Sequence, residues 1–352
     1  MRALKIFVRR FLPTSLIGGF ASVFALVQVA IAQSVTTDPV GFINFNIQGT
    51  NGASNGALTF LGLSFTQPVS YQATFSSANG TTLTDSNATW VDDQFNGANG
   101  SFYVELITGN GTGMTSQITA TVAATHSIKT ADDLSSFVNA NTGYKIRQNW
   151  TLGSVFGTGS TLVLNAGTAT SADEVLVYSS KTQSYTIYYY KSGGLGGTGW
   201  RTTSDPSTDQ TATPFLPAAG VVVKRAQSSS LSFPLTGAVK VGQSSIPIGT
   251  GLSLVSNVYP AGNLTLGNSN LISSGFTGGT ATSSDEVQIY NSGTGLYTTY
   301  YFKSGGLGGT GWRTTSDPST DQSGVAIPSG ESIFVQRNQN RPAFNWTLPQ
   351  PF

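Results

Sequence analysis

The sequence predicts an all-β protein made of tandem small β-barrel or β-sandwich modules, with short connecting loops and at most one short helix. Short runs rich in β-branched and aromatic residues recur along the chain, separated by Gly, Asn and Ser turns, as in barrels and sandwiches. A long motif also occurs twice: the segment KSGGLGGTGWRTTSDPSTDQ spans residues 191–210 and, unchanged, residues 303–322. Such a repeat indicates modules of one kind arranged in tandem.

The first 32 residues predict an export signal. Basic residues precede an apolar run over residues 16–32, which ends in the small-x-small sequence Ala30-Ile31-Ala32, the pattern of a cleaved signal peptide. An uncleaved anchor is the alternative, because the run approaches the roughly 18 residues that span a bilayer. Gly18, Gly19 and the cleavage box favour removal. We therefore expect an exported protein, extracellular or on the cell surface, with the periplasm as an alternative and no transmembrane segment after cleavage.

Composition narrows the function classes. Only 9% of the residues are charged, and Lys and Arg do not cluster outside the signal, so the chain lacks the basic surface that nucleic acid requires. The absence of cysteine excludes disulfides, thiol nucleophiles and thiolate metal sites, and it leaves burial and hydrogen bonds to stabilise an exported fold. Because the signal holds basic residues and no acids, the mature chain carries a net negative charge.

The predicted N-terminal module contains a series of short strands. A turn at Asp38-Pro39 leads into the first strand, around residues 42–47, since Asp-Pro favours turns. Gly and Asn turns separate the strands that follow. These later strands are expected at residues 58–65, 81–85, 102–108, 114–122 and 127–130.

One segment of this module, residues 131–138, has helical features. Thr130 is a suitable N-cap, and Asp132 and Asp133 suit the first turn of a helix. The apolar residues that would line one face are Leu134, Phe137 and Val138. We predict a short helix here and no other.

A recurring apolar strand that ends in Arg predicts the module boundaries. It occurs at residues 144–147, 221–225 and 333–337, and it places boundaries near Arg147 and Gln227. Residues 246–260 also echo residues 58–68, so the last module has an upstream half that the middle one lacks. The predicted organisation is a signal peptide (1–32), an N-terminal β module (33–147), a first repeat-bearing module (148–227) and a second repeat-bearing module (228–352).

Several segments of the chain are similar to a known family. The sequences TTDPVGF at residues 36–42, NWTLGSVFG at 149–157 and YFKSGGLGGTGWR at 301–313 resemble exported bacterial proteins described only as conserved hypothetical proteins. The resemblance covers most of the mature chain, but that family has no established activity, cofactor or catalytic residue, so none is implied. Residues 82–90 and 105–113 resemble a small β-barrel motif of surface and phage-tail proteins, which implies fold alone.

The glycines of the repeated segment match a nucleotide-binding pattern in form only. That pattern, GxGxxG, works by turning a strand into a helix whose N-terminus holds a pyrophosphate. The WRTTSDP sequence that follows has no helical periodicity, so we predict a glycine-rich hairpin loop with positive φ values. The glycines concerned are Gly194, Gly196 and Gly199, and in the second copy Gly306, Gly308 and Gly311.

The aspartates of the repeated segment are weak calcium candidates. Asp205 and Asp209, with Asp317 and Asp321 in the second copy, place oxygens at positions 1, 3 and 5, as calcium loops do. The glycine at position 6 and the glutamate at position 12 of such loops are missing. An Asx turn around Asp-Pro is the simpler interpretation, so we expect no cofactor unless calcium binds here.

Carboxylate and histidine catalysis have little support. Asp173 and Glu174, like Asp285 and Glu286, are neighbours on a predicted strand. Their side chains should point to opposite faces and cannot share a substrate. His126 is the single histidine. The one Gly-x-Ser-x-Gly match, residues 52–56, lies in a Gly/Asn/Ser loop before a predicted strand, without the strand-to-helix turn of the nucleophile elbow that a triad would need. We predict no catalytic residue.

The best binding candidates are tyrosines within the tyrosine-rich runs that start at Tyr185 and Tyr297, together with the Trp-Arg pair that follows each run. Exposed Trp and Tyr faces can stack on sugar rings, and Arg can sit over a ring or pair with an acid. Cross-strand packing inside each module is the alternative. The candidates are Tyr188, Tyr189, Trp200 and Arg201 in the first copy and Tyr300, Tyr301, Trp312 and Arg313 in the second.

Together these features predict a non-enzymatic β-rich protein that is structural, self-associating or adhesive, because packing arrays and multivalent binding both gain from duplicated modules. Its expected partner is a second copy of itself or an extracellular or cell-surface polysaccharide, and not nucleic acid. Two alternatives are a carbohydrate-binding module protein that uses the Trp and Tyr faces, and a secreted hydrolase with converging carboxylates.

Overall fold

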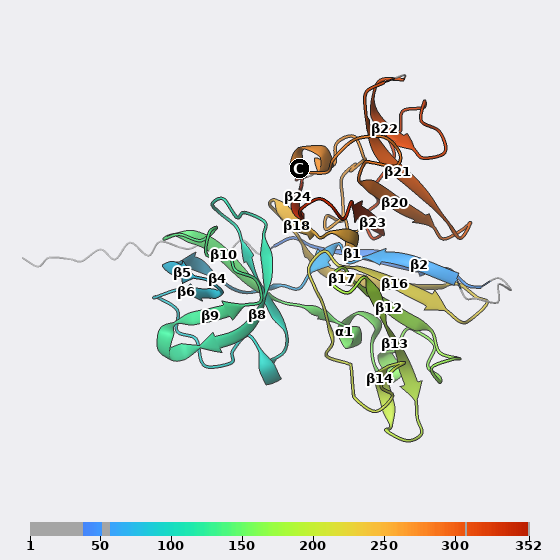
Figure 1. Cartoon of the computed structure of the whole chain (residues 1–352). Helices are drawn as coiled ribbons and strands as arrows, with labels where there is room; N and C mark the ends of the chain where they lie inside the picture. Colours follow the sequence, from blue (N-terminus) through green and yellow to red (C-terminus); the bar gives the residue numbers. More distant parts are fainter. Residues whose placement is uncertain (1–37, 51–56, 307, 351–352) are drawn as a thin grey trace, which may run out of the picture. The chain divides into compact units, whose positions relative to one another are not determined.

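The computed structural model describes residues 38–50, 57–306 and 308–350, so the predicted signal peptide lies outside the described residues. Strands dominate the described chain, and its α-helices are two short ones, α1 (Leu152–Phe156) and α2 (Leu271–Ser274) (Figure 1). The predicted all-β class is confirmed. No helix in the described part of the chain is long and apolar enough to cross a membrane.

A closed barrel occupies residues 69–148. One sheet runs in the order β4-β10-β7-β8-β9-β6-β5. Its end strands β4 and β5 are separated only by Ser76, whose N–H donates to the Thr84 carbonyl at 2.7 Å, so the two ends of the sheet join. Leu83, Val104 and Ile128 are fully buried in its core. The strands are β4 (Val69–Phe75), β5 (Ser77–Asn79), β6 (Thr82–Thr84), β7 (Phe102–Leu106), β8 (Thr115–Val122), β9 (Ser127–Thr130) and β10 (Thr142–Gln148).

The helix predicted at residues 131–138 is wrong, since this segment forms turns and bends. Thr130 Oγ1 donates to the Asp132 carbonyl at 2.7 Å, and Asp133 Oδ1 accepts from the Ser135 N–H at 2.9 Å. Such local side-chain bonds offer the backbone an alternative to a helix. The limit of one short helix is also exceeded, because the described chain has two, α1 and α2. Helix α1 starts at a capping box in which the Thr151 and Ser154 side chains each accept from the other's backbone N–H.

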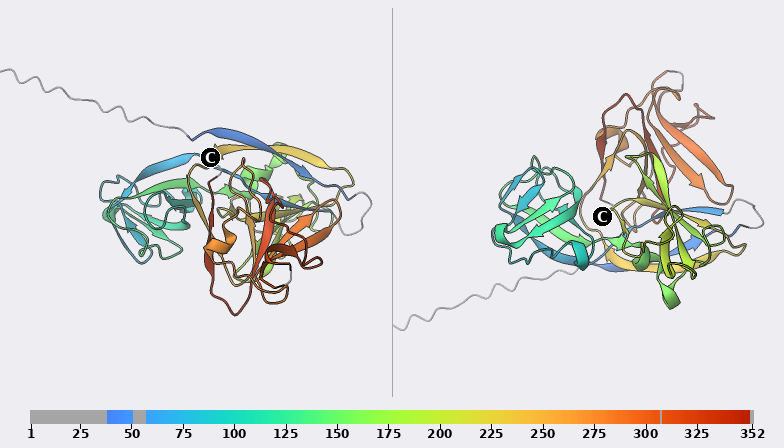
Figure 2. Two further views of the ribbon diagram at one scale, coloured as in Figure 1. Left: turned by 90° about the horizontal axis from the view of Figure 1, so that it is seen from above. Right: turned by 60° about the horizontal axis from the view of Figure 1, so that its bottom comes forward.

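The first repeat comprises residues 40–66 and 149–239, on either side of the barrel. Its five-stranded sheet runs β14-β13-β12-β16-β2, and β1-β17-β3 forms a smaller sheet in which β1 and β17 lie side by side (Figure 2). The strands are β1 (Val40–Ile47), β2 (Ala57–Gly62), β3 (Phe65–Thr66), β11 (Trp150–Thr151), β12 (Glu174–Ser179), β13 (Ser184–Ser192), β14 (Thr198–Thr202), β15 (Pro214–Phe215), β16 (Gly220–Arg225) and β17 (Leu231–Val239).

The second repeat, residues 244–348, has the same strand order without an inserted barrel. Its sheet runs β19-β23-β20-β21-β22, matching β2-β16-β12-β13-β14, and β18 pairs with β24 as β1 pairs with β17. The strands are β18 (Ser244–Ile248), β19 (Gly251–Ser256), β20 (Glu286–Asn291), β21 (Leu296–Ser304), β22 (Thr310–Thr314), β23 (Ser332–Arg337) and β24 (Phe344–Leu348).

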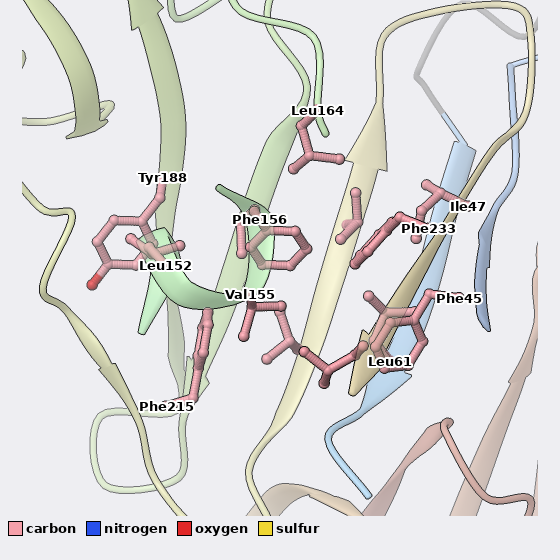
Figure 3. Close-up of a cluster of buried hydrophobic side chains, with 14 of the residues drawn as sticks. Phe45, Ile47, Leu61, Leu152, Val155, Phe156, Leu164, Tyr188, Phe215 and Phe233 are labelled. Atoms are coloured by element: carbon pink, nitrogen blue, oxygen red, sulfur yellow. The ribbon is translucent and has the colours of Figure 1, made fainter. Parts of the chain in front are cut away.

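Strand pairing revises the predicted boundaries 33–147, 148–227 and 228–352. Strands β1 and β2 precede the barrel in sequence, yet they pair with β17 and β16. Figure 3 shows Phe45 beside Phe233 in one core, where the ring centroids lie 5.5 Å apart. The first repeat therefore contains the upstream half that it appeared to lack, and it closes at Val239 rather than near Gln227.

Candidate functional site

The two tryptophans proposed as surface stacking residues lie in the cores of the repeats. Trp200 on β14 is 0% exposed and Trp312 on β22 is 2% exposed. The Trp200 ring packs against Tyr190 and Phe156, and its Nε1 donates to the Gly157 carbonyl at 2.9 Å. The packing alternative is correct, because β14 is covered on both faces: its residues from Gly199 to Thr202 are all buried.

The arginine of each pair ties the repeated loop to its hairpin. Arg201 is buried, and its Nη1 donates to Asp209 Oδ1 at 2.9 Å and to the Trp200 carbonyl at 2.7 Å. Its Nη2 donates to the Gly196 carbonyl at 2.8 Å. Arg313 repeats all three bonds. The remaining candidates are buried too, which corrects the proposed surface site: Tyr188, Tyr189, Tyr300 and Tyr301.

The repeated glycines form the predicted hairpin loop. Gly194, Gly196 and Gly199 have positive φ, and the segment after them continues as β14 rather than as a helix. A GxGxxG site would need a helix N-terminus at this position. The hairpin interpretation is therefore confirmed.

The aspartates proposed as calcium ligands are hydrogen-bonded to protein groups instead. Asp205 Oδ1 accepts from the Ser207 N–H at 2.9 Å, from the Ser207 hydroxyl at 2.5 Å and from the Thr208 N–H, an Asx turn. These hydrogen bonds hold the pKa of Asp205 below its ordinary value. Asp209 instead pairs with Arg201. Asp317 and Asp321 repeat the arrangement, and the described residues contain no group of three or more side chains suited to a metal ion.

The neighbouring acids point to opposite faces, as predicted. Asp173 is fully buried and accepts from Arg225 Nη1 at 2.6 Å and from the Ala226 N–H at 2.8 Å. Glu174 pairs with Lys224 at 3.1 Å on the other face. In the second repeat, Asp285 is likewise buried and pairs with Arg337 and Arg341, while Glu286 is half-buried.

His126 has a local role. It adopts a left-handed backbone conformation after a 3-10 turn, with φ of 48°. Its Nδ1 lies 2.7 Å from the Ala88 carbonyl. This hydrogen bond links two loops of the barrel.

A buried charge cluster that sequence reasoning missed joins the barrel to the two ends of the first repeat, before β1 and after β17. Arg147 Nη2 pairs with Asp38 at 2.5 Å, and Lys145 reaches the same carboxylate at 3.2 Å. Glu105 on β7 pairs with Lys240, which follows β17. Burial opposes ionisation of Asp38, but Arg147 and Lys145 hold its pKa below the ordinary value. The Arg that ends β10 was visible in the sequence, whereas its partners come from distant segments.

A cavity of about 50 Å³ adjoins this cluster, with Glu105, Asn149, Trp150 and Lys240 in its lining. Pockets for drug-sized ligands measure about 300 Å³ or more. The cavity is therefore too small for such a ligand. The ion pairs of the cluster connect the barrel to the ends of the first repeat, and we call this set of contacts the joint.

The two repeats meet face to face with approximate two-fold symmetry. The Gly62 N–H donates to the Gly330 carbonyl at 2.9 Å, and the Ser256 N–H donates to the Ala218 carbonyl at 2.9 Å. Gly62 and Ser256 occupy equivalent positions, opposite Gly220 on β16 and Ser332 on β23. The same surface of each repeat is therefore used in one contact, as in an isologous dimer.

An aromatic seam crosses this contact. We define the seam as six rings from both repeats: Phe60, Tyr178, Tyr185, Tyr290, Tyr297 and Phe334. Phe60 of the first repeat lies 4.7 Å from Tyr290 of the second, and Tyr178 lies 5.3 Å from Phe334, centroid to centroid. Tyr185 and Tyr297 are 37% and 44% exposed. They start the tyrosine-rich runs visible in the sequence, but only the pairing of the sheets brings them to one surface.

Comparison of the chain with family models, curated proteins and solved structures found no match.

Proposed function

We propose that this chain is an exported, non-enzymatic β-rich protein with a structural, self-associating or adhesive role at the cell surface or outside the cell. The seam carries the proposal, because two copies of one module recognise each other there through the same face. A self-complementary face is the kind of surface through which separate copies also associate.

The ion pairs made by equivalent side chains in the two repeats support an architectural role. Arg201 and Arg313 fasten loops, while Asp173 and Asp285 hold buried arginines. The strongest candidates for chemistry are thus committed to keeping strands and loops together. Export is supported by the signal pattern of residues 1–32 and by the resemblance to exported bacterial proteins.

Cell fractionation and light scattering test this proposal. The full-length chain should appear outside the cytoplasm, whereas a matched chain without residues 1–32 should stay inside. The purified mature protein should show a molar mass that rises with concentration, or it should adhere to cell-derived surfaces. A protein that remains cytoplasmic, or one that is monomeric at every concentration and adheres to nothing, would contradict it.

A further inference from the structure

Tyr185 and Tyr297 form the exposed part of the aromatic seam. Tyr185 packs edge-on against Tyr178 with centroids 5.0 Å apart, and Tyr297 packs against Tyr290 at the same distance. Tyr297 also lies 5.8 Å from Phe60 of the other repeat. Each ring is therefore fixed by neighbours and loses little rotational freedom when a ligand covers it.

Two further rings connect the exposed rings across the seam. The Tyr297 centroid lies 6.3 Å from that of Phe334, which lies 5.3 Å from Tyr178, the ring against which Tyr185 packs. Burial raises the pKa of Tyr185, and the charge that Tyr297 would carry raises it further, as expected for neighbouring phenol groups. Gln183, in the turn before β13, also crosses the seam: its amide donates to the Leu252 carbonyl at 3.0 Å and accepts from the Leu252 N–H at 2.8 Å. The two-ring surface is thus held by both repeats.

The side chains beside these rings are polar and uncharged. Gln183 is exposed, and its Oε1 accepts from the Tyr178 hydroxyl at 3.1 Å. Thr299, which shares the face of β21 with Tyr297, is half-buried. Lys181 is the charged residue nearest to Tyr185 in sequence. An acidic or basic partner would find little charge to pair with, whereas a neutral sugar offers C–H faces for stacking and hydroxyls for hydrogen bonding.

We propose that Tyr185 and Tyr297 bind a neutral polysaccharide chain laid across the seam between the repeats. This inference rests on the proposed adhesive role and names its ligand class. It differs from the surface predicted from the sequence, whose tryptophans and tyrosines are buried. Stacking on a fixed pair of rings would give each repeat one contact with successive sugar units.

Depletion of the mature protein by insoluble cellulose, chitin, xylan and β-1,3-glucan tests the proposal. The wild type should bind at least one of them, and Tyr185→Ala with Tyr297→Ala should weaken binding by about tenfold or more, the usual effect of removing aromatic anchors. The Tyr→Phe pair should stay within about threefold of wild type, since stacking needs the ring. Phe42→Ala is the matched control, because Phe42 is 67% exposed on β1, and it should bind as wild type does.

If the alanine pair does not fold, the Tyr185→Leu and Tyr297→Leu pair retains apolar packing without a flat ring, and it should show the same loss. Absence of binding to all four polysaccharides, or equal binding by the ring-deleted and wild-type proteins, overturns the inference. Light scattering of the wild type, run in parallel, reports self-association independently, so the proposed function can stand when polysaccharide binding fails.

Discussion

The two repeats share one strand order and one identical segment, yet they differ where they meet other parts of the chain. The first repeat contains the barrel and has glycines where it contacts the second repeat, Gly62 and Gly220, whereas the second has Ser256 and Ser332 at the equivalent positions. The second also has an additional cation, Arg341, beside its buried aspartate. The hairpins are unchanged while the contact surfaces differ, which indicates that each repeat is adapted to one side of an unequal pair.

The largest expected difference concerns the buried aspartates. Arg225→Met leaves Asp173 buried without its cation and should lower the free energy of unfolding by about 3–5 kcal/mol. Arg337→Met should cost about 1–2 kcal/mol less, because Arg341 Nη1 still lies 3.1 Å from Asp285 Oδ1. Denaturant unfolding of both variants measures the two losses of unfolding free energy and shows which is larger. Equal losses would mean that Arg341 does not compensate.

The contact between the two repeats should tolerate a new side chain poorly at Gly62. A Cβ on Gly62 would lie 2.3 Å from the Glu331 carbonyl oxygen and 2.8 Å from Ser256 Cβ. Gly62→Ala should therefore cost about 1–3 kcal/mol of unfolding free energy through overpacking. Ser256→Ala is the matched change and should be within about 0.5 kcal/mol of wild type, because the Ser256 hydroxyl has no hydrogen-bond partner among the described residues. Similar losses in both variants would contradict the unequal pair.

Equivalent substitutions in the two repeated loops should lower the free energy of unfolding by equal amounts. Asp209→Asn and Asp321→Asn each remove a carboxylate that accepts from a buried Arg at 2.9 Å. The expected cost is about 1–2 kcal/mol for each. Unfolding measurements that separate the two by more than about 1 kcal/mol would show that identical segments are held differently by their surroundings.

The smallest expected effect is the acid sensitivity of the barrel joint, which only the first repeat has. The pKa of Asp38 is lowered in the folded state, so its stabilising contribution is present above the ordinary pKa of 3.8 and is lost as pH falls through the lowered value. Wild type should exceed Asp38→Asn in unfolding free energy by about 1 kcal/mol near neutral pH. The difference should shrink only below about pH 4; a pH-independent difference would exclude Asp38 ionisation as its cause.

Local chemistry made several features predictable from the sequence alone. Short strands with Gly and Asn turns indicated an all-β chain, the glycines of residues 193–199 indicated a hairpin, and period-two geometry separated Asp173 from Glu174. These predictions hold because turn chemistry and strand alternation depend on residues close together in the chain. The prediction of a helix at residues 131–138 failed because the Thr130 hydroxyl donates to the Asp132 carbonyl and the Asp133 carboxylate accepts from the Ser135 N–H, which favours turns there.

Tertiary structure alone decided how the segments combine. Pairing between β1 and β17 joins residues separated by the entire barrel, and no local pattern specifies that partner. The burial of Trp200 and the exposure of Tyr185 depend on which sheet face is covered, which alternation by itself leaves open. The sequence thus determined the class, the hairpins and the duplication, while long-range strand pairing determined the inserted barrel and the seam that supports the proposed function.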